Sequence, residues 1–295
     1  MLELATGAKQ SGPGQRLFSP ATGFEALPAP IRMSRGQVVA LVVVLTIAAA
    51  GLCAEAVRRQ GAVRPRARDF YRSSSALLAP FSLWCAGRSL GGAPPFPPMA
   101  LHFPRHAALR DSWREIRDEA LAVHAQGRAA KIKGDLFFTT IADDKWKRFY
   151  IKWYGPAGAD ARALCPRTCA LLDALPEVRL AMFSILEPGA VIRPHTGPFK
   201  SCLRYHLGLS CPPEAQITVD GVPYSWRDGE DVLFDDTFVH SVVNGSASRP
   251  RVVLFCDVER AMTSPASARF NRRVCDALGP LTTRANDKTE KAARG

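Results

Sequence analysis

The sequence contains no C-x-x-C pair, although eight of its 295 residues are cysteines. The cysteines are scattered along the chain, which excludes a small disulfide-stapled protein and argues against a zinc knuckle. Cys165 and Cys169 are four residues apart, a spacing that fits one face of a helix better than a metal site. We therefore expect the cysteines to be mostly free, buried thiols, as in proteins of a reducing compartment.

Acidic residues are also scarce, because 27 Asp and Glu are outnumbered by 39 Lys and Arg, for a formal net charge of +12. This excess favours an acidic partner surface, either nucleic acid or anionic lipid. The chain lacks the glycine-rich loops, zinc spacing and RNA-binding signatures that accompany nucleic-acid binding, so no nucleic acid partner is expected. Its 47% of hydrophobic residues exclude a fully disordered chain and a collagen-like fibre.

Only one long uncharged apolar run is present, the 19 residues 36–54, which excludes a polytopic membrane protein. As a helix this run would span about 28 Å, close to the thickness of a bilayer core. It predicts a single transmembrane anchor after a flexible leader, residues 1–35. A cleaved signal peptide ending near the A-x-A sequence at 54–56 is the alternative. More arginines follow the run than precede it, which predicts a cytoplasmic-facing domain, with the lumenal orientation as the other possibility.

The remaining chain changes character twice. Residues 55–100 are rich in Arg and Pro and predict a linker, and residues 263–295 predict a loosely attached basic tail. Apolar periodicity predicts helices over 107–126 and 161–175, and the aromatic and basic run 146–154 predicts an inner strand. Short strand patterns then follow at 179–186, 203–209, 215–219, 231–234 and 251–258. Strands of this length and spacing predict a mainly β sandwich or barrel.

The polar residues of the strand region suggest a metal beside an anion site. His195 and His240 lie at predicted strand edges, so they could meet across a sandwich and bind a divalent metal, although two structural histidines would fit as well. Arg204 and His206 alternate onto one face of their strand. Arg251 begins another strand, where an inward guanidinium would need a carboxylate or phosphate and an outward one a rim salt bridge.

Three blocks in this region resemble a known family. They are FSILEPGAVIRPHTGPFKSCLRYHLGL (183–209), DGEDVLFDDTFVHSVVN (228–244) and PRVVLFCDVERAM (250–262). In order and spacing they resemble the aspartyl/asparaginyl β-hydroxylases, a family of Fe(II)- and 2-oxoglutarate-dependent dioxygenases. The resemblance implies a double-stranded β-helix, or jelly roll, with flanking N-terminal helices, over a dioxygenase domain at 101–262. The expected protein is thus a membrane-anchored enzyme.

The resemblance also implies roles for individual residues. His195 and His240 match the two histidines that bind iron, and Arg251 matches the arginine that pairs with the far carboxylate of 2-oxoglutarate. Ser184, Arg204 and His206 match further positions that bind this co-substrate. The implied reaction uses Fe(II), 2-oxoglutarate and O2, hydroxylates a C–H bond, and releases succinate and CO2.

One position departs from the wider oxygenase superfamily, which carries a carboxylate two residues after its first histidine. Gly197 stands there in this chain, as in the aspartyl hydroxylase branch, where water takes the vacant place at the iron. Asp236, four residues before His240, could hold that water or could cap a turn. The alternative for the whole domain is a catalytically inactive jelly-roll binding module that keeps the anion site.

The blocks WKRFYIKWYG (146–155), LCPRT (164–168), LRYHLGL (203–209) and FCDVER (255–260) resemble instead the bacterial lipid A hydroxylases and related acyl-chain hydroxylases. That group carries the His-x-Asp form, so the metal site is similar to one branch and the framework to the other. The expected substrate is therefore a lipid acyl chain or the Asp/Asn side chain of a protein. Membrane lipid is the expected partner of the anchor in either case.

Overall fold

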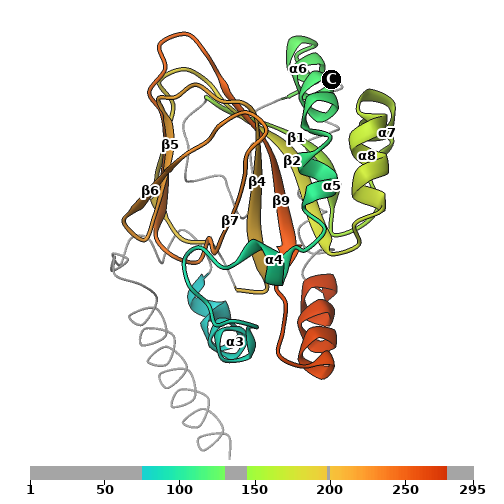
Figure 1. Ribbon diagram of the computed structural model, residues 1–295, viewed down its shortest axis with the longest axis vertical. Coiled ribbons are helices and arrows are strands. Elements are labelled where there is room, and N and C mark those ends of the chain that lie inside the picture. The colour runs from blue at the N-terminus through green and yellow to red at the C-terminus, as the bar shows by residue number, and fades with distance from the viewer. Residues whose placement is uncertain (1–74, 130–144, 198–199, 278–295) are drawn as a thin grey trace, which may run out of the picture. The chain divides into compact units, whose positions relative to one another are not determined.

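A computed structural model describes residues 75–129, 145–197 and 200–277 of the chain (Figure 1). Two antiparallel sheets form its centre. The larger sheet has the order β1 (Trp146–Trp153), β2 (Val178–Leu186), β9 (Arg251–Glu259), β4 (Cys202–Ser210) and β7 (Asp231–Phe234). The smaller has the order β3 (Val191–His195), β8 (His240–Asn244), β5 (Ala215–Val219) and β6 (Val222–Ser225). From β2 to β9 the chain passes back and forth between the sheets, apart from the β5–β6 hairpin, which stays in the smaller sheet, and this arrangement confirms the predicted jelly roll.

Both faces of the larger sheet are buried, and β2 shows why its sequence is almost continuously apolar. Phe183 and Ile185 belong to the core between this sheet and the helices, whereas Met182 and Leu186 belong to the core between the two sheets. Successive side chains of a strand point to opposite faces, so a strand buried on both sides needs apolar residues at nearly every position. A polar residue on β2, such as Ser184, therefore stands out.

The helices cover one face of the larger sheet, as Figure 1 shows for α6 and α8. The elements are α4 (Met99–His102), α5 (Ala107–Arg110), α6 (Trp113–Ala125), α7 (Ala159–Leu164) and α8 (Pro166–Asp173). Each of the two predicted helices is broken in two. The second breaks at Cys165, because the following proline disfavours helical geometry at the residue before it and begins α8 instead.

The predicted domain boundaries at residues 100 and 262 leave out segments that pack on the sandwich. Helix α3 (Ser75–Arg88) buries Cys85 completely, and residues 265–277 form a helix that buries Asn271 and Cys275. The Asn271 side chain donates a hydrogen bond of 2.9 Å to the backbone oxygen of Ser201. Composition alone suggested a linker and a tail, whereas buried small and polar residues attach both helices to the domain.

Two other expectations concern the membrane and the thiols. Residues 36–54 lie outside the described part of the chain, and none of the helices within it is long and apolar enough to cross a bilayer. All seven cysteines that the structure describes are free and buried, as expected. The aromatic and basic run forms β1, which lies at the edge of the larger sheet and is not the inner strand expected from the sequence.

A buried charge cluster supports the loop between β7 and β8. Asp235 is completely buried, and one of its oxygens lies 2.7 Å from Lys200 Nζ and 2.7 Å from Arg260 Nη2. Its other oxygen accepts hydrogen bonds from the hydroxyl and backbone nitrogen of Thr237. Asp235 thus fixes the loop that carries the next residue, Asp236.

Asp235→Asn should lower the free energy of unfolding by about 3–5 kcal/mol near neutral pH, because two buried cations lose their counter-ion. Burial raises the pKa of Asp235, but Arg260 and Lys200 outweigh it and hold this pKa at about 2. The carboxylate therefore contributes stability above about pH 4, its ordinary titration range, and that contribution is lost as the pH falls toward 2. Urea unfolding at pH 7 and pH 3 should show a smaller gap between variant and wild type at pH 3.

The control for this comparison is Asp173→Asn, which removes an exposed partner of Arg162 and should change stability little. An equal difference in unfolding free energy between wild type and Asp235→Asn at both pH values would contradict the role given to Asp235.

Candidate active site

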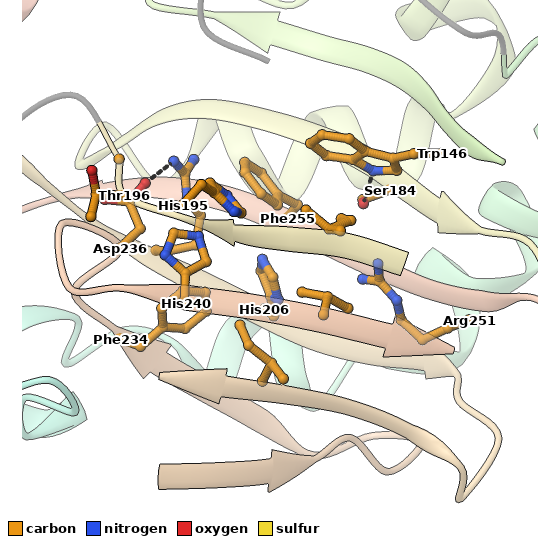
Figure 2. A pocket seen from close by; sticks show the side chains of 15 residues that line it. Trp146, Ser184, His195, Thr196, His206, Phe234, Asp236, His240, Arg251 and Phe255 are labelled. Atoms are coloured by element: carbon orange, nitrogen blue, oxygen red, sulfur yellow. Dashed lines mark hydrogen bonds and ion pairs between the residues drawn. The ribbon is translucent and has the colours of Figure 1, made fainter. Parts of the chain in front are cut away.

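A cavity lies between the two sheets, and every site residue expected from the sequence lines it (Figure 2). These residues are Ser184, His195, Arg204, His206, Asp236, His240 and Arg251. Strands β2, β4 and β9 supply the residues of one wall, and β3 and β8 supply the two histidines of the other. Six of them gather through strand alternation, since each points inward from its own sheet, whereas Asp236 comes from the β7–β8 loop.

His195 and His240 form one end of the cavity. They are the last residue of β3 and the first of β8, they pair across these strands, and their ring centroids are 4.0 Å apart. The Nδ1 atoms lie 2.7 Å from the backbone oxygen of Arg193 and 2.9 Å from that of Phe238. An Nδ1–H that donates to a carbonyl leaves Nε2 with a free electron pair, the form in which imidazole binds metals.

Both imidazoles are neutral at physiological pH. Burial lowers the pKa of His240 to about 4, and burial together with the neighbouring His240 holds the pKa of His195 well below its usual range. Two neutral imidazoles that converge are donors suited to a divalent transition metal. Across the described ranges, no three His, Cys, Asp or Glu side chains are placed to hold a metal together, so the protein donors here are two.

Asp236 occupies the place that a side chain at position 197 would take. The backbone nitrogen of Gly197 donates to the backbone oxygen of Asp236 at 2.6 Å, and a Cβ on Gly197 would overlap the Asp236 carboxylate. This carboxylate lines the cavity and forms an ion pair with Arg204 (Figure 2). The absent carboxylate two residues after His195 is thus matched in space by one from the β7–β8 loop.

Gly197→Ala should displace Asp236 from Arg204 and destabilise the protein by about 1–3 kcal/mol, the usual range for overpacking a filled site. Asp236→Ala removes the carboxylate that the new Cβ would overlap. The double variant should therefore lose less stability than the sum of the two single losses. Urea unfolding of the four proteins of this cycle measures the coupling. Strictly additive losses would mean that the two positions do not share this space.

Arg204 joins Asp236 to a second carboxylate that sequence reasoning missed. Its guanidinium forms ion pairs with Asp236 and Asp257 and lies 4.1 Å from the ring centre of Phe255. Burial alone would lower the pKa of Arg204, but Asp257 and Asp236 outweigh it and raise this pKa, so the guanidinium stays charged. Strand alternation could have found Asp257, because it shares the inner face of β9 with Arg251 and Phe255.

Arg251 lies at the opposite end of the cavity from the two histidines, with His206 between (Figure 2). The Arg251 side chain is 1% exposed, and within the described residues its Nε and Nη1 have no hydrogen-bond acceptor. It stacks 4.7 Å from the ring centre of Trp226, and burial lowers its pKa to about 10. A buried, charged donor without an acceptor is costly, so this end of the cavity is suited to an anion.

Two further polar groups line the same region. Both ring nitrogens of His206 are buried without a partner in the described part of the chain, and burial with the nearby Arg251 and Arg204 holds the pKa of His206 well below its usual range. The Ser184 hydroxyl accepts a hydrogen bond of 2.9 Å from the indole nitrogen of Trp146. His206 and Ser184 can therefore offer neutral hydrogen bonds to a ligand held by Arg251.

Aromatic rings form much of the remaining wall, and sequence reasoning did not place them there. Phe255 and Phe234 lie 5.0 Å and 5.1 Å from the His206 ring, centre to centre, and Trp146 covers Ser184 (Figure 2). The signal for Trp146 was present in the aromatic and basic run, but alternation alone did not decide which face of that strand would be inward. These rings exclude water from the polar groups between them.

Comparisons with known proteins identify hydroxylases as similar to this chain. The family model described as Aspartyl/Asparaginyl beta-hydroxylase matches residues 110–261. The chain is 37% identical over 131 residues to an ornithine lipid ester-linked acyl 2-hydroxylase of Rhizobium tropici, covering 43% of this chain and 46% of that protein. It is 33% identical over 168 residues to an aspartyl/asparaginyl beta-hydroxylase of Homo sapiens, covering 55% and 22%. The chain thus spans less than half the length of these two relatives.

A solved structure is also similar, though distantly. A prolyl-4-hydroxylase of Pseudomonas putida aligns with a TM-score of 0.35 at 21% identity, over 52% of this chain and 88% of that one.

Proposed function

Because the chain belongs to the aspartyl/asparaginyl β-hydroxylase family, we propose that it is an Fe(II)- and 2-oxoglutarate-dependent dioxygenase that uses O2 to hydroxylate a C–H bond. The carrying observation is the pair of cavity ends, with two neutral histidines at one and, at the other, an Arg251 guanidinium whose Nε and Nη1 have no acceptor among the described residues. A metal and a dicarboxylic acid between them would satisfy both ends. The catalytically inactive binding module remains the alternative outcome of the tests below.

The chain's residues fit the iron. His195 and His240 would hold it through their Nε2 atoms, while the carbonyls of Arg193 and Phe238 fix the tautomer of each ring. When bound, the iron activates oxygen for attack on an unactivated C–H bond. Asp236 would orient a water molecule at the place where other oxygenases supply a carboxylate, and Arg204 holds Asp236 in position.

The residues fit 2-oxoglutarate as well. Arg251 would bind the distant carboxylate with its free donors, and Ser184 beside it would add a hydroxyl. His206 lies between Arg251 and the histidines, where the oxo-acid end of the co-substrate would reach, and Arg204, held by Asp236 and Asp257, lines the cavity as well. The rings of Trp146 and Phe255 exclude water from these contacts, which strengthens them. The products would be succinate, CO2 and the hydroxylated substrate.

We propose a lipid acyl chain as the substrate class, because a relative acts as an ornithine lipid acyl 2-hydroxylase and the chain carries an apolar run at residues 36–54. The same run is the basis for proposing a single-pass membrane protein, and the excess of arginines after it is the basis for proposing that the catalytic domain faces the cytoplasm. The second candidate is the Asp/Asn side chain of a protein. It is favoured by Gly197, which gives the metal site the form that resembles the protein hydroxylases.

The deciding experiment is succinate release by the full chain with Fe(II), ascorbate and 2-oxoglutarate. Acylated lipid, Asp- and Asn-containing peptides, and no addition are compared. Stimulation by lipid supports acyl hydroxylation, and stimulation by peptide supports the second candidate. If nothing stimulates turnover and Fe(II) does not bind, while 2-oxoglutarate still does, the inactive binding module is the correct description.

A further inference from the structure

Three aromatic rings meet at the surface where two segments far apart in the sequence come together. Phe81 and Trp84 lie on α3, and Phe270 lies on the helix at residues 265–277, next to α3 in Figure 1. The Trp84 ring centre is 4.8 Å from that of Phe270 and 5.7 Å from that of Phe81. Phe270 is 49% exposed and Leu83, on α3, is 39% exposed. We call these four residues the aromatic surface.

Helix α3 is unusual for a helix with an exposed side. Residues 73–87 contain no charged residue and no histidine. The side of α3 that faces the domain is buried through Ser82 and Cys85, whereas Leu83 and Gly87 are exposed. A helix at the surface of a soluble domain carries charged residues on its outer side. The outer side of α3 is therefore suited to a less polar environment than water.

Arginines surround the aromatic surface. Arg88 ends α3 and is exposed, and Arg269 and Arg273 are exposed on the same helix as Phe270. Arg273 follows Phe270 by three residues, so both lie on one side of that helix. Aromatic rings beside arginines are the combination found at membrane interfaces, where rings lie among headgroups and guanidinium groups bind lipid phosphates.

We propose that the aromatic surface docks the folded domain onto an anionic lipid bilayer. Positive charge around the rings complements such a membrane and would be unfavourable against a second copy of the same basic surface. The chain before α3 gives an independent argument, because the apolar run ends at residue 54 and the next 20 residues hold six arginines. A linker this short keeps α3 near any membrane that the apolar run enters, which raises its effective concentration there.

Docking through α3 would orient the cavity. The Ser82 hydroxyl of α3 lies 3.2 Å from the backbone nitrogen of Lys200, whose side chain holds Asp235, the neighbour of Asp236. The aromatic surface thus lies at the end of the sandwich that carries the β7–β8 loop. This end also carries the two histidines, so the metal end of the cavity would face the lipid. The docking itself does not depend on the chain being an active enzyme.

The test uses the full chain reconstituted into vesicles of phosphatidylcholine and phosphatidylglycerol whose acyl chains carry bromine, which quenches tryptophan on contact. The tryptophan fluorescence of the wild type should be quenched, and the Trp84→Phe variant should lose most of this quenching. Trp113→Phe, which removes an indole stacked under Arg114 and Arg117 on α6, should keep it. Equal quenching in wild type and Trp84→Phe, or none in wild type, would overturn the proposal.

A matched pair of variants separates docking from folding. Leu83→Glu and Leu121→Glu each place a charge on a helix at a leucine that is 39% or 38% exposed, respectively. Leu83→Glu should reduce the quenching of Trp84 by about half or more and Leu121→Glu should not, with equal melting temperatures for both. If both variants changed the quenching equally, the proposed docking through the aromatic surface would be refuted. A concentration-dependent dimer that Leu83→Glu abolishes would assign the surface to a second copy instead.

Discussion

Replacing Arg251 by methionine should raise the KM for 2-oxoglutarate by about 10²–10³-fold, because a buried charge pair loses one partner, an effect of about 2–5 kcal/mol. The side chain is almost fully buried, and within the described structure two of its nitrogens have no acceptor. Methionine has a similar length and no charge, so the protein without co-substrate should be as stable as wild type or more stable. Stability and co-substrate affinity should therefore change in opposite directions.

Steady-state kinetics and melting curves with and without 2-oxoglutarate measure both effects. Wild type should melt at a higher temperature when the co-substrate is added, and Arg251→Met should not. The control is Arg227→Met, which removes an exposed arginine paired only loosely with Glu230 at 3.4 Å. An unchanged KM in Arg251→Met would show that the anion binds elsewhere.

His240→Ala should abolish turnover and Fe(II) binding, and His195→Ala should do the same. Among the described residues these two histidines are the donors at this end of the cavity, so either change leaves a single imidazole, too few to hold the metal. Anaerobic titration with Fe(II) measures binding apart from catalysis. The control is His124→Ala, a histidine on α6 whose Nε2 lies 3.7 Å from Glu187. Wild-type turnover by purified His240→Ala would refute the assignment of the ligands.

Strand alternation and turn residues are local signals, so the strand pattern could predict a β sandwich or barrel, while the jelly roll came from the family resemblance. Strand β4 illustrates this, since Arg204 and His206 point into the cavity as the two-residue period requires. The grouping of the seven site residues depended on the family resemblance, because spacing alone left both histidines open to a structural role. The expectation that the two histidines meet across the sandwich was wrong in one respect, because they lie side by side on β3 and β8 of the same sheet, where antiparallel pairing joins residues far apart in the sequence.

The overlap between Asp236 and position 197 could not be predicted. It depends on how closely the β7–β8 loop approaches the end of β3, and this distance is set by Asp235, Lys200 and Arg260 together. The packing of α3 on the domain could not be predicted from the sequence for a different reason. Its outer side lacks the charged residues that make a helical period visible, so its composition resembled a linker.

The hydrogen bonds that orient His195 and His240 come from the protein's own backbone. A zinc finger, by contrast, folds only when its ion is bound. Here each imidazole is oriented by a carbonyl two residues before it in the chain, at Arg193 and at Phe238. If iron binds as proposed, its removal should therefore abolish activity without unfolding the domain, because the backbone and not the metal orients both rings.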